Sequence, residues 1–212
     1  MPARPARLAL AAVLLAGLAA HPALAQAALA QDGPAVRALS AELGDAQRVH
    51  LWRVGAWGVA NAVGGAALWL ASSPETSAGW RAFGLQSAAW GAVNTGIAAF
   101  GLAGGAGDPA ADWAAALGAE NGYADVLLVN LGLNVGYAAV GATLWAVSGR
   151  GVADPAAWRG HGVALVLQGI GLFVLDGIAY LGTRARLGAL VDLAASASIT
   201  AAPGGVALVV GL

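Results

Sequence analysis

The residue of this sequence that most directly suggests chemistry is a carboxylic acid within a long apolar stretch. Asp176 is the only charged side chain between residues 160 and 183. An ionised carboxylate at the centre of a membrane helix costs on the order of 3 kcal/mol on insertion scales. Such an acid is typical of a proton or cation site. The structural alternative is a protonated carboxyl group that completes a hydrogen-bonded network.

Amide side chains in the other apolar stretches share a depth with this acid. Asn61, Asn94 and Asn134 each lie well inside a charge-free stretch. At about 1.5 Å of rise per residue, Asn61, Asn134 and Asp176 lie roughly 10–12 Å from the outer ends of their helices, and Asn94 about 15 Å. The other candidates for this polar layer lie on the same helix faces, and they are Asn130, Tyr137 and Tyr180.

The polar layer has a structural explanation as well as a functional one. Asn side chains join membrane helices by hydrogen bonds worth about 0.6 kcal/mol on average. That explanation is favoured for the amides, whereas both remain open for Asp176.

The sequence contains no set of residues typical of catalysis. It has no Cys, no Gly-x-Ser-x-Gly elbow, no phosphate-binding loop and no dinucleotide fingerprint. His50 and His161 fall on opposite membrane sides in the topology derived below, so they cannot share a metal ion. We therefore predict that the chain is not an enzyme and that it uses neither a cofactor nor a metal.

The helices that must position these residues follow from composition. Hydrophobic residues make up 59% and charged residues 10% of the 212 residues, whereas a soluble domain usually carries about 25% charge. Spanning helices need about 20 apolar residues, and their backbone groups must pair within the segment. We predict an all-α membrane protein, a four-helix transmembrane bundle within residues 54–183. Its spans are 54–73, 82–104, 126–148 and 161–183.

Three segments lie outside this bundle. Residues 1–25 predict a cleaved signal peptide, because arginines precede an apolar run and an Ala-x-Ala site; an uncleaved anchor is the alternative. Residues 26–53 predict an extracytoplasmic amphipathic helix on the membrane surface, with Val36, Leu43 and His50 on one face. Residues 184–212 predict an extracytoplasmic tail with a short β-hairpin, and a fifth span over 193–212 is the alternative.

The signal peptide fixes the expected topology. Four spans after an exported N-terminus place both mature termini outside the cytoplasm, and helical spans favour the inner (cytoplasmic) membrane of a bacterium. The expected partner is the lipid bilayer, with a second copy of the chain or another envelope protein as a further candidate. A net charge of −1 gives the chain no excess of positive charge that would attract nucleic acid.

Two helical hairpins show an internal likeness. Gly-Ala-Ala-Leu-Trp at 65–69 resembles Gly-Ala-Thr-Leu-Trp at 141–145, and Trp-Arg-Ala-Phe-Gly at 80–84 resembles Trp-Arg-Gly-His-Gly at 158–162. This pattern favours a duplicated hairpin, and the alternative is a chance match between Ala- and Gly-rich helices.

Longer motifs carry a resemblance to a known family. They are Trp-Gly-x-x-Asn at 57–61 and 90–94, Asn-Leu-Gly-Leu-Asn-Val-Gly-Tyr at 130–137, and Gln-Gly-Ile-Gly-Leu-Phe-Val-Leu-Asp at 168–176. Through these motifs the chain resembles an uncharacterised family of small bacterial four-helix integral membrane proteins. The resemblance covers roughly residues 51–181 and implies a fold and a location but no activity.

Two functions remain open from the sequence. The first is a structural or interaction subunit of the bacterial envelope, which the lack of catalytic residues favours. The second is a small transporter or proton/cation-coupled carrier that uses the polar layer around Asp176.

Overall fold

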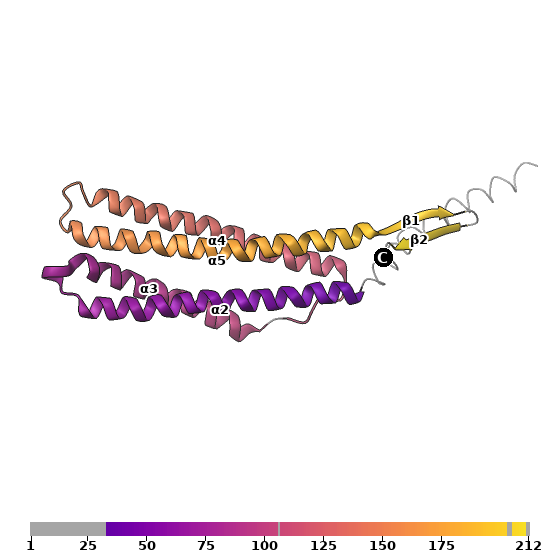
Figure 1. The fold of residues 1–212 in the computed structure, drawn as a ribbon, viewed down its shortest axis with the longest axis horizontal. Coiled ribbons are helices and arrows are strands. Elements are labelled where there is room, and N and C mark those ends of the chain that lie inside the picture. The colour runs from indigo at the N-terminus through magenta and orange to yellow at the C-terminus, as the bar shows by residue number, and fades with distance from the viewer. Residues whose placement is uncertain (1–32, 106, 203–204, 211–212) are drawn as a thin grey trace, which may run out of the picture.

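The folded body of the protein is all-helical. The computed structural model describes residues 33–105, 107–202 and 205–210, so the predicted signal peptide lies outside the described residues. The four helices of the body are α2 Gly33–Ala71, α3 Pro74–Gly104, α4 Trp113–Val147 and α5 Pro155–Ser196. They lie side by side, with the α2–α3 and α4–α5 connections at one end (Figure 1). The prediction of four helices is confirmed.

Two short strands follow the last helix. They are β1 Ala197–Ala202 and β2 Gly205–Val210, which pair antiparallel with Ala197 opposite Val210. Figure 1 shows the strands projecting from the end of the helical body. Residues 203–204, on which the predicted turn falls, lie outside the described residues.

Local signals explain where the helices begin and end. The side chains of Ser73, Asp112 and Asp154 accept hydrogen bonds from backbone N–H groups three residues later, at 3.1, 2.9 and 3.1 Å. Such side-chain hydrogen bonds satisfy the free backbone N–H groups at the start of a helix, and prolines suit the first turns of α3 and α5. α3 ends at Gly104 and is followed by Gly105, whose φ of 70° is readily adopted only by glycine.

The helices are longer than the predicted spans. α2 has 39 residues and α5 has 42, which corresponds to roughly 60 Å at 1.5 Å per residue. The hydrocarbon core of a bilayer is about 30 Å thick. Among the described residues, α2, α4 and α5 are long and apolar enough to cross a membrane.

The extra length forms a small helical domain, which we call the cap: residues 33–49 of α2, 113–122 of α4 and 184–196 of α5. Val36, Ala116 and Leu190 form its buried core, and the Trp113 indole N–H donates to the Leu190 carbonyl at 2.8 Å. The structure therefore places the N-terminal amphipathic segment differently from our prediction. Its apolar face packs against α4 and α5, and α2 runs without a break from the cap into the first predicted span.

The cap also contains a buried ion pair. The Arg186 guanidinium donates to the Glu120 carboxylate and to the Thr183 hydroxyl, the latter at 3.0 Å. Glu120 is 2% exposed and Thr183 is fully buried. Removing one partner of such a buried ion pair strongly destabilises the fold, because the other charge stays buried without compensation.

Below the cap, exposed large apolar side chains form a band around the body. The band covers residues 52–70, 80–100, 126–145 and 158–181 of the four helices in turn. Each run is about 20 residues long and therefore about 30 Å tall, which matches the hydrocarbon core. The helix α3 contributes to this band as fully as the others, with Phe100 84% exposed.

The two hairpins are packed through equivalent glycines. A Cβ added at Gly65 would lie 2.6 Å from the Gly84 carbonyl oxygen, and one at Gly141 would lie 2.6 Å from the Gly162 carbonyl oxygen. Gly141 follows Gly65 by 76 residues and Gly162 follows Gly84 by 78, the same offsets that the sequence motifs show. The helices of both hairpins thus approach closely at matched positions.

Candidate functional site

Asp176 lies at the centre of a buried polar cluster. Asp176 is 4% exposed, and each of its carboxylate oxygens has a partner. Oδ1 lies 3.1 Å from His50 Nε2, and Oδ2 accepts a hydrogen bond from Asn134 Nδ2 at 2.6 Å. A buried carboxylate needs partners of this kind, because removing it from water is costly. Three helices, α2, α4 and α5, each provide one residue of the cluster.

A glycine lets α4 and α5 approach closely enough for this contact. A Cβ added at Gly169 would lie 2.5 Å from the Asn134 carbonyl oxygen and 2.8 Å from the Ala138 nitrogen. Gly169 lies two helical turns before Asp176 on α5, so it sets the spacing of the two helices beside the Asn134–Asp176 hydrogen bond.

A cavity of about 380 Å³ borders the cluster. We call it the cleft. It lies between α2, α3 and α4, and Leu172 and Asp176 of α5 lie behind it. Its polar lining comprises Gln47, Arg48, His50, Asn94, Tyr123, Asn130, Asn134 and Tyr137, and the remaining lining residues are mostly apolar.

The cleft opens into the apolar band. Ile97 of α3 and Val126 and Leu133 of α4 line it, and these side chains are 57, 55 and 47% exposed. They belong to the exposed apolar band, whereas Gln47 and Arg48 border the cleft on the cap side. The cleft therefore has an apolar mouth and a polar interior.

Three polar atoms around the cleft have no hydrogen-bond partner within the described part of the chain. They are His50 Nδ1, Asn94 Nδ2 and the Tyr123 hydroxyl. His50 is 7% and Asn94 is 4% exposed, and the Tyr123 ring packs edge-on against His50 with centroids 6.5 Å apart. A buried unsatisfied polar group typically costs about 1–3 kcal/mol. Three residues with such groups line one cavity, which makes the cleft the candidate site.

The cleft exists because the two hairpins meet unevenly. On one side, Trp57 of α2 packs on Gly171 of α5, where an added Cβ would lie 2.4 Å from the ring. On the other side, α3 and α4 make no extensive contact with each other, and Trp90 meets Tyr137 at a centroid distance of 4.6 Å. The seam between α2 and α5 is thus closed, and the one between α3 and α4 leaves room for the cleft.

The predicted site residues fall into two groups. Asn94, Asn130, Asn134, Tyr137 and Asp176 all line the cleft, whereas Asn61 and Tyr180 do not.

Asn61 belongs to a separate network. Gln168 Nε2 donates to Asn61 Oδ1 at 2.6 Å, and the Trp57 indole N–H donates to Gln168 Oε1 at 2.9 Å. Gln168 is 1% exposed, so this network closes the α2–α5 seam and leaves little polar surface for a ligand.

Sequence reasoning missed two residues of the cleft, His50 and Tyr123. His50 was assigned to the surface segment, although its spacing of seven residues from both Leu43 and Trp57 places all three near one face of a continuous helix. Tyr123 precedes the predicted third span, and the sequence carries no signal for its inward orientation.

The described residues contain no group of three His, Cys, Asp or Glu side chains that could hold a metal ion. What the arrangement offers instead is hydrogen bonding. His50 Nε2 lies beside the Asp176 carboxylate, and His50 lines the same cavity as Asn94 and Tyr123.

A family model described as "Family of unknown function (DUF6992)" matches residues 53–177. The chain belongs to this family. The DUF6992 match contains Asn94, Tyr123 and Asn134 and ends one residue after Asp176, whereas His50 and the cap segment of α2 precede it. No curated protein and no solved structure matches the chain.

Proposed function

We propose that this DUF6992 protein is a four-span membrane protein that binds a small amphiphilic molecule in the cleft. The polar part of the ligand lies against His50, Asn94 and Tyr123, and the apolar part extends through the mouth into the bilayer. The observation that carries this proposal is that three residues with buried, unpartnered polar atoms line one cavity of about 380 Å³. Ligand pockets commonly measure about 300–1,000 Å³.

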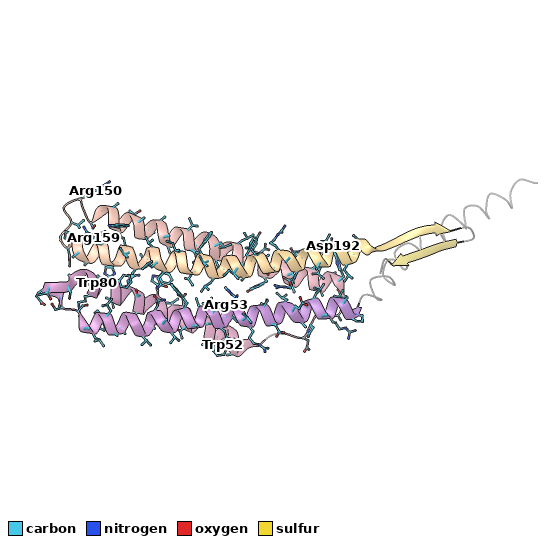
Figure 2. The ribbon with its side chains drawn as sticks, in the orientation of Figure 1. Trp52, Arg53, Trp80, Arg150, Arg159 and Asp192 are labelled. Carbon is cyan, nitrogen blue, oxygen red and sulfur yellow. The ribbon has the colours of Figure 1, made fainter. Side chains whose placement is uncertain are left out.

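The proposal places all four helices in the inner membrane of a bacterium. α3 is the fourth span, because its exposed apolar run is as tall as those of its neighbours. Trp80, Arg150 and Arg159 gather at the loop end of the body (Figure 2), as expected for the cytoplasmic membrane boundary. Trp52 lies about 25 Å along α2 from Leu70 at 1.5 Å per residue, and it marks the outer boundary.

In this orientation both mature termini and the cap are extracytoplasmic. The cleft then lies in the outer half of the bilayer, and its mouth between α3 and α4 faces lipid. A ligand dissolved in the membrane can enter sideways without crossing the polar surface. This geometry supports the binding of a membrane-dissolved molecule more directly than a purely structural role in the envelope.

The first test measures binding with a panel of probes that have straight alkyl tails of nine or ten carbons, which we call the decyl panel. The purified protein in mild detergent is melted with 1-decanol, 4-decylphenol, decanoate, 2-dodecanone or decyltrimethylammonium. At least one probe is expected to raise the melting temperature, because a ligand that binds only the native state stabilises it.

A pair of matched variants locates the binding. Leu133→Trp places a large ring at the mouth of the cleft, and we expect it to abolish the stabilisation. Val129→Trp adds the same ring to the same helix at a lipid-facing position that does not line the cleft, and stabilisation should persist. If no probe stabilises the protein, or if both variants respond alike, the ligand-binding function is wrong and the envelope-subunit alternative takes its place.

A further inference from the structure

The chemistry of the cleft narrows the ligand to one kind of head group, an inference that rests on the proposed function. The Asp176 side chain is 6% exposed and each of its carboxylate oxygens already has a partner, so it offers little surface to a ligand cation. The buried polar atoms beside the cleft that have no partner within the described chain are His50 Nδ1, Asn94 Nδ2 and the Tyr123 hydroxyl oxygen. The head group is inferred from these three atoms.

The contact with Asp176 decides what His50 Nδ1 can do. Nε2 lies 3.1 Å from Asp176 Oδ1, which can only accept when the carboxylate is ionised, so this contact favours the tautomer with the proton on Nε2. In a neutral ring Nδ1 then has a lone pair and accepts a hydrogen bond, and in a protonated ring Nδ1 donates one. A ligand that suits both states needs an atom that can donate and accept.

Asn94 adds a fixed requirement. An amide Nδ2 can only donate, so the ligand must also present an acceptor. Tyr123 can serve as donor or acceptor and therefore discriminates less. The ligand must therefore place a hydrogen-bond acceptor near Asn94 and a group that can both donate and accept near His50.

We infer that the cleft recognises an uncharged hydroxyl head group, an alcohol or a phenol, on an apolar tail. A hydroxyl oxygen accepts from Asn94 Nδ2, and its proton is donated to Nδ1 of the neutral His50 ring. When the ring is protonated, the same oxygen accepts from Nδ1. A ketone or a carboxylate cannot donate to the neutral ring, and a quaternary ammonium group makes no hydrogen bond to any of the three atoms.

The decyl panel tests this inference separately from the proposed function. We expect 1-decanol or 4-decylphenol to bind at least about tenfold more tightly than decanoate, 2-dodecanone and decyltrimethylammonium, which is about 1.4 kcal/mol. The relative affinities of 1-decanol and 4-decylphenol distinguish an aliphatic from an aromatic source of the hydroxyl group. Binding of a charged or ketone probe that equals or exceeds both, lost in Leu133→Trp, would overturn the head-group assignment and leave the ligand-binding function standing.

Variants of single side chains test which of them contact the head group of the ligand. Asn94→Leu removes a donor that has no partner within the described chain, so the fold should tolerate it while affinity for the hydroxyl probe falls about tenfold. Tyr123→Phe should lower the affinity for the hydroxyl probe at least threefold. Tyr180→Phe, which changes a tyrosine outside the cleft, should leave this affinity unchanged. Unchanged affinity in both Asn94→Leu and Tyr123→Phe would contradict the inference, and melting of the ligand-free variants shows that each is folded.

Discussion

The buried contact between His50 and Asp176 makes a quantitative prediction about the stability of the fold. Replacing His50 by Leu leaves a buried carboxylate with Asn134 as its remaining partner, and breaking a buried pair in this way typically costs about 3–5 kcal/mol. Replacing Asp176 by Leu strands two donors, His50 Nε2 and Asn134 Nδ2, at about 1–3 kcal/mol each, or about 2–6 kcal/mol together.

The double variant should lose much less free energy of unfolding than the two single variants lose in total. With both side chains replaced, Asn134 Nδ2 is the stranded donor of this cluster, which costs about 1–3 kcal/mol. The smallest expected sum of the single effects is about 5 kcal/mol, so the coupling between His50 and Asp176 is at least about 2 kcal/mol.

The assay is unfolding of the purified protein in mild detergent by added sodium dodecyl sulfate, followed by circular dichroism. The free energy of unfolding is compared among wild type, the two single variants and the double variant. The control cycle pairs Asp176→Leu with Val63→Ala, a lipid-facing change that should be additive within about 0.5 kcal/mol. If the effects of His50→Leu and Asp176→Leu are additive to the same degree, the two side chains do not form the pair and the account of the cluster is wrong.

Two further predictions concern the scaffold around the cleft. Gly169→Ala should lower the free energy of unfolding by at least about 2 kcal/mol in the same assay, because its Cβ would meet the α4 backbone. Gly132→Ala, where nothing lies within 4 Å of the added Cβ, should be neutral or stabilising by up to about 1 kcal/mol, and equal losses in the two variants would refute the packing argument. Glu120→Gln should destabilise the cap by about 3–5 kcal/mol, because it leaves the Arg186 charge in a largely buried site, and limited proteolysis should cut the cap sooner than in wild type; an unchanged cleavage pattern would show that the ion pair does not hold the cap.

Hydropathy located the membrane-facing part of each helix but not its full length. The predicted spans ended at residues 73, 104 and 148, close to the observed ends of α2 at Ala71, α3 at Gly104 and α4 at Val147. The first part of α2 was predicted as a separate amphipathic helix, and the start of α4 was placed too late. In the cap only one face of each helix is apolar, so a hydropathy window averages that face with the charged ones and ends the predicted span there.

Depth alone could not assign the polar residues to one site. Rise along a helix gives the level of Asn61 and Asn134, but it gives no information about rotation around the helix axis. Asn134 faces Asp176, whereas Asn61 at a similar predicted depth faces Gln168 across the other seam. The partner of Asp176 on α2 is His50, which could be found only by treating the amphipathic segment and the first span as one helix.

The central claim is that a membrane-dissolved molecule occupies the cleft through the mouth between α3 and α4. The most direct measurement is photolabelling in lipid vesicles with a decyl alcohol that carries a diazirine in its tail, followed by mass spectrometry of the labelled peptides. The account predicts labelling concentrated near Ile97 and Leu133, reduced by excess 1-decanol and absent in Leu133→Trp. Labelling spread evenly over the lipid-facing band, as strong at Val63 and Leu181 as at the mouth and insensitive to competitor, would contradict it.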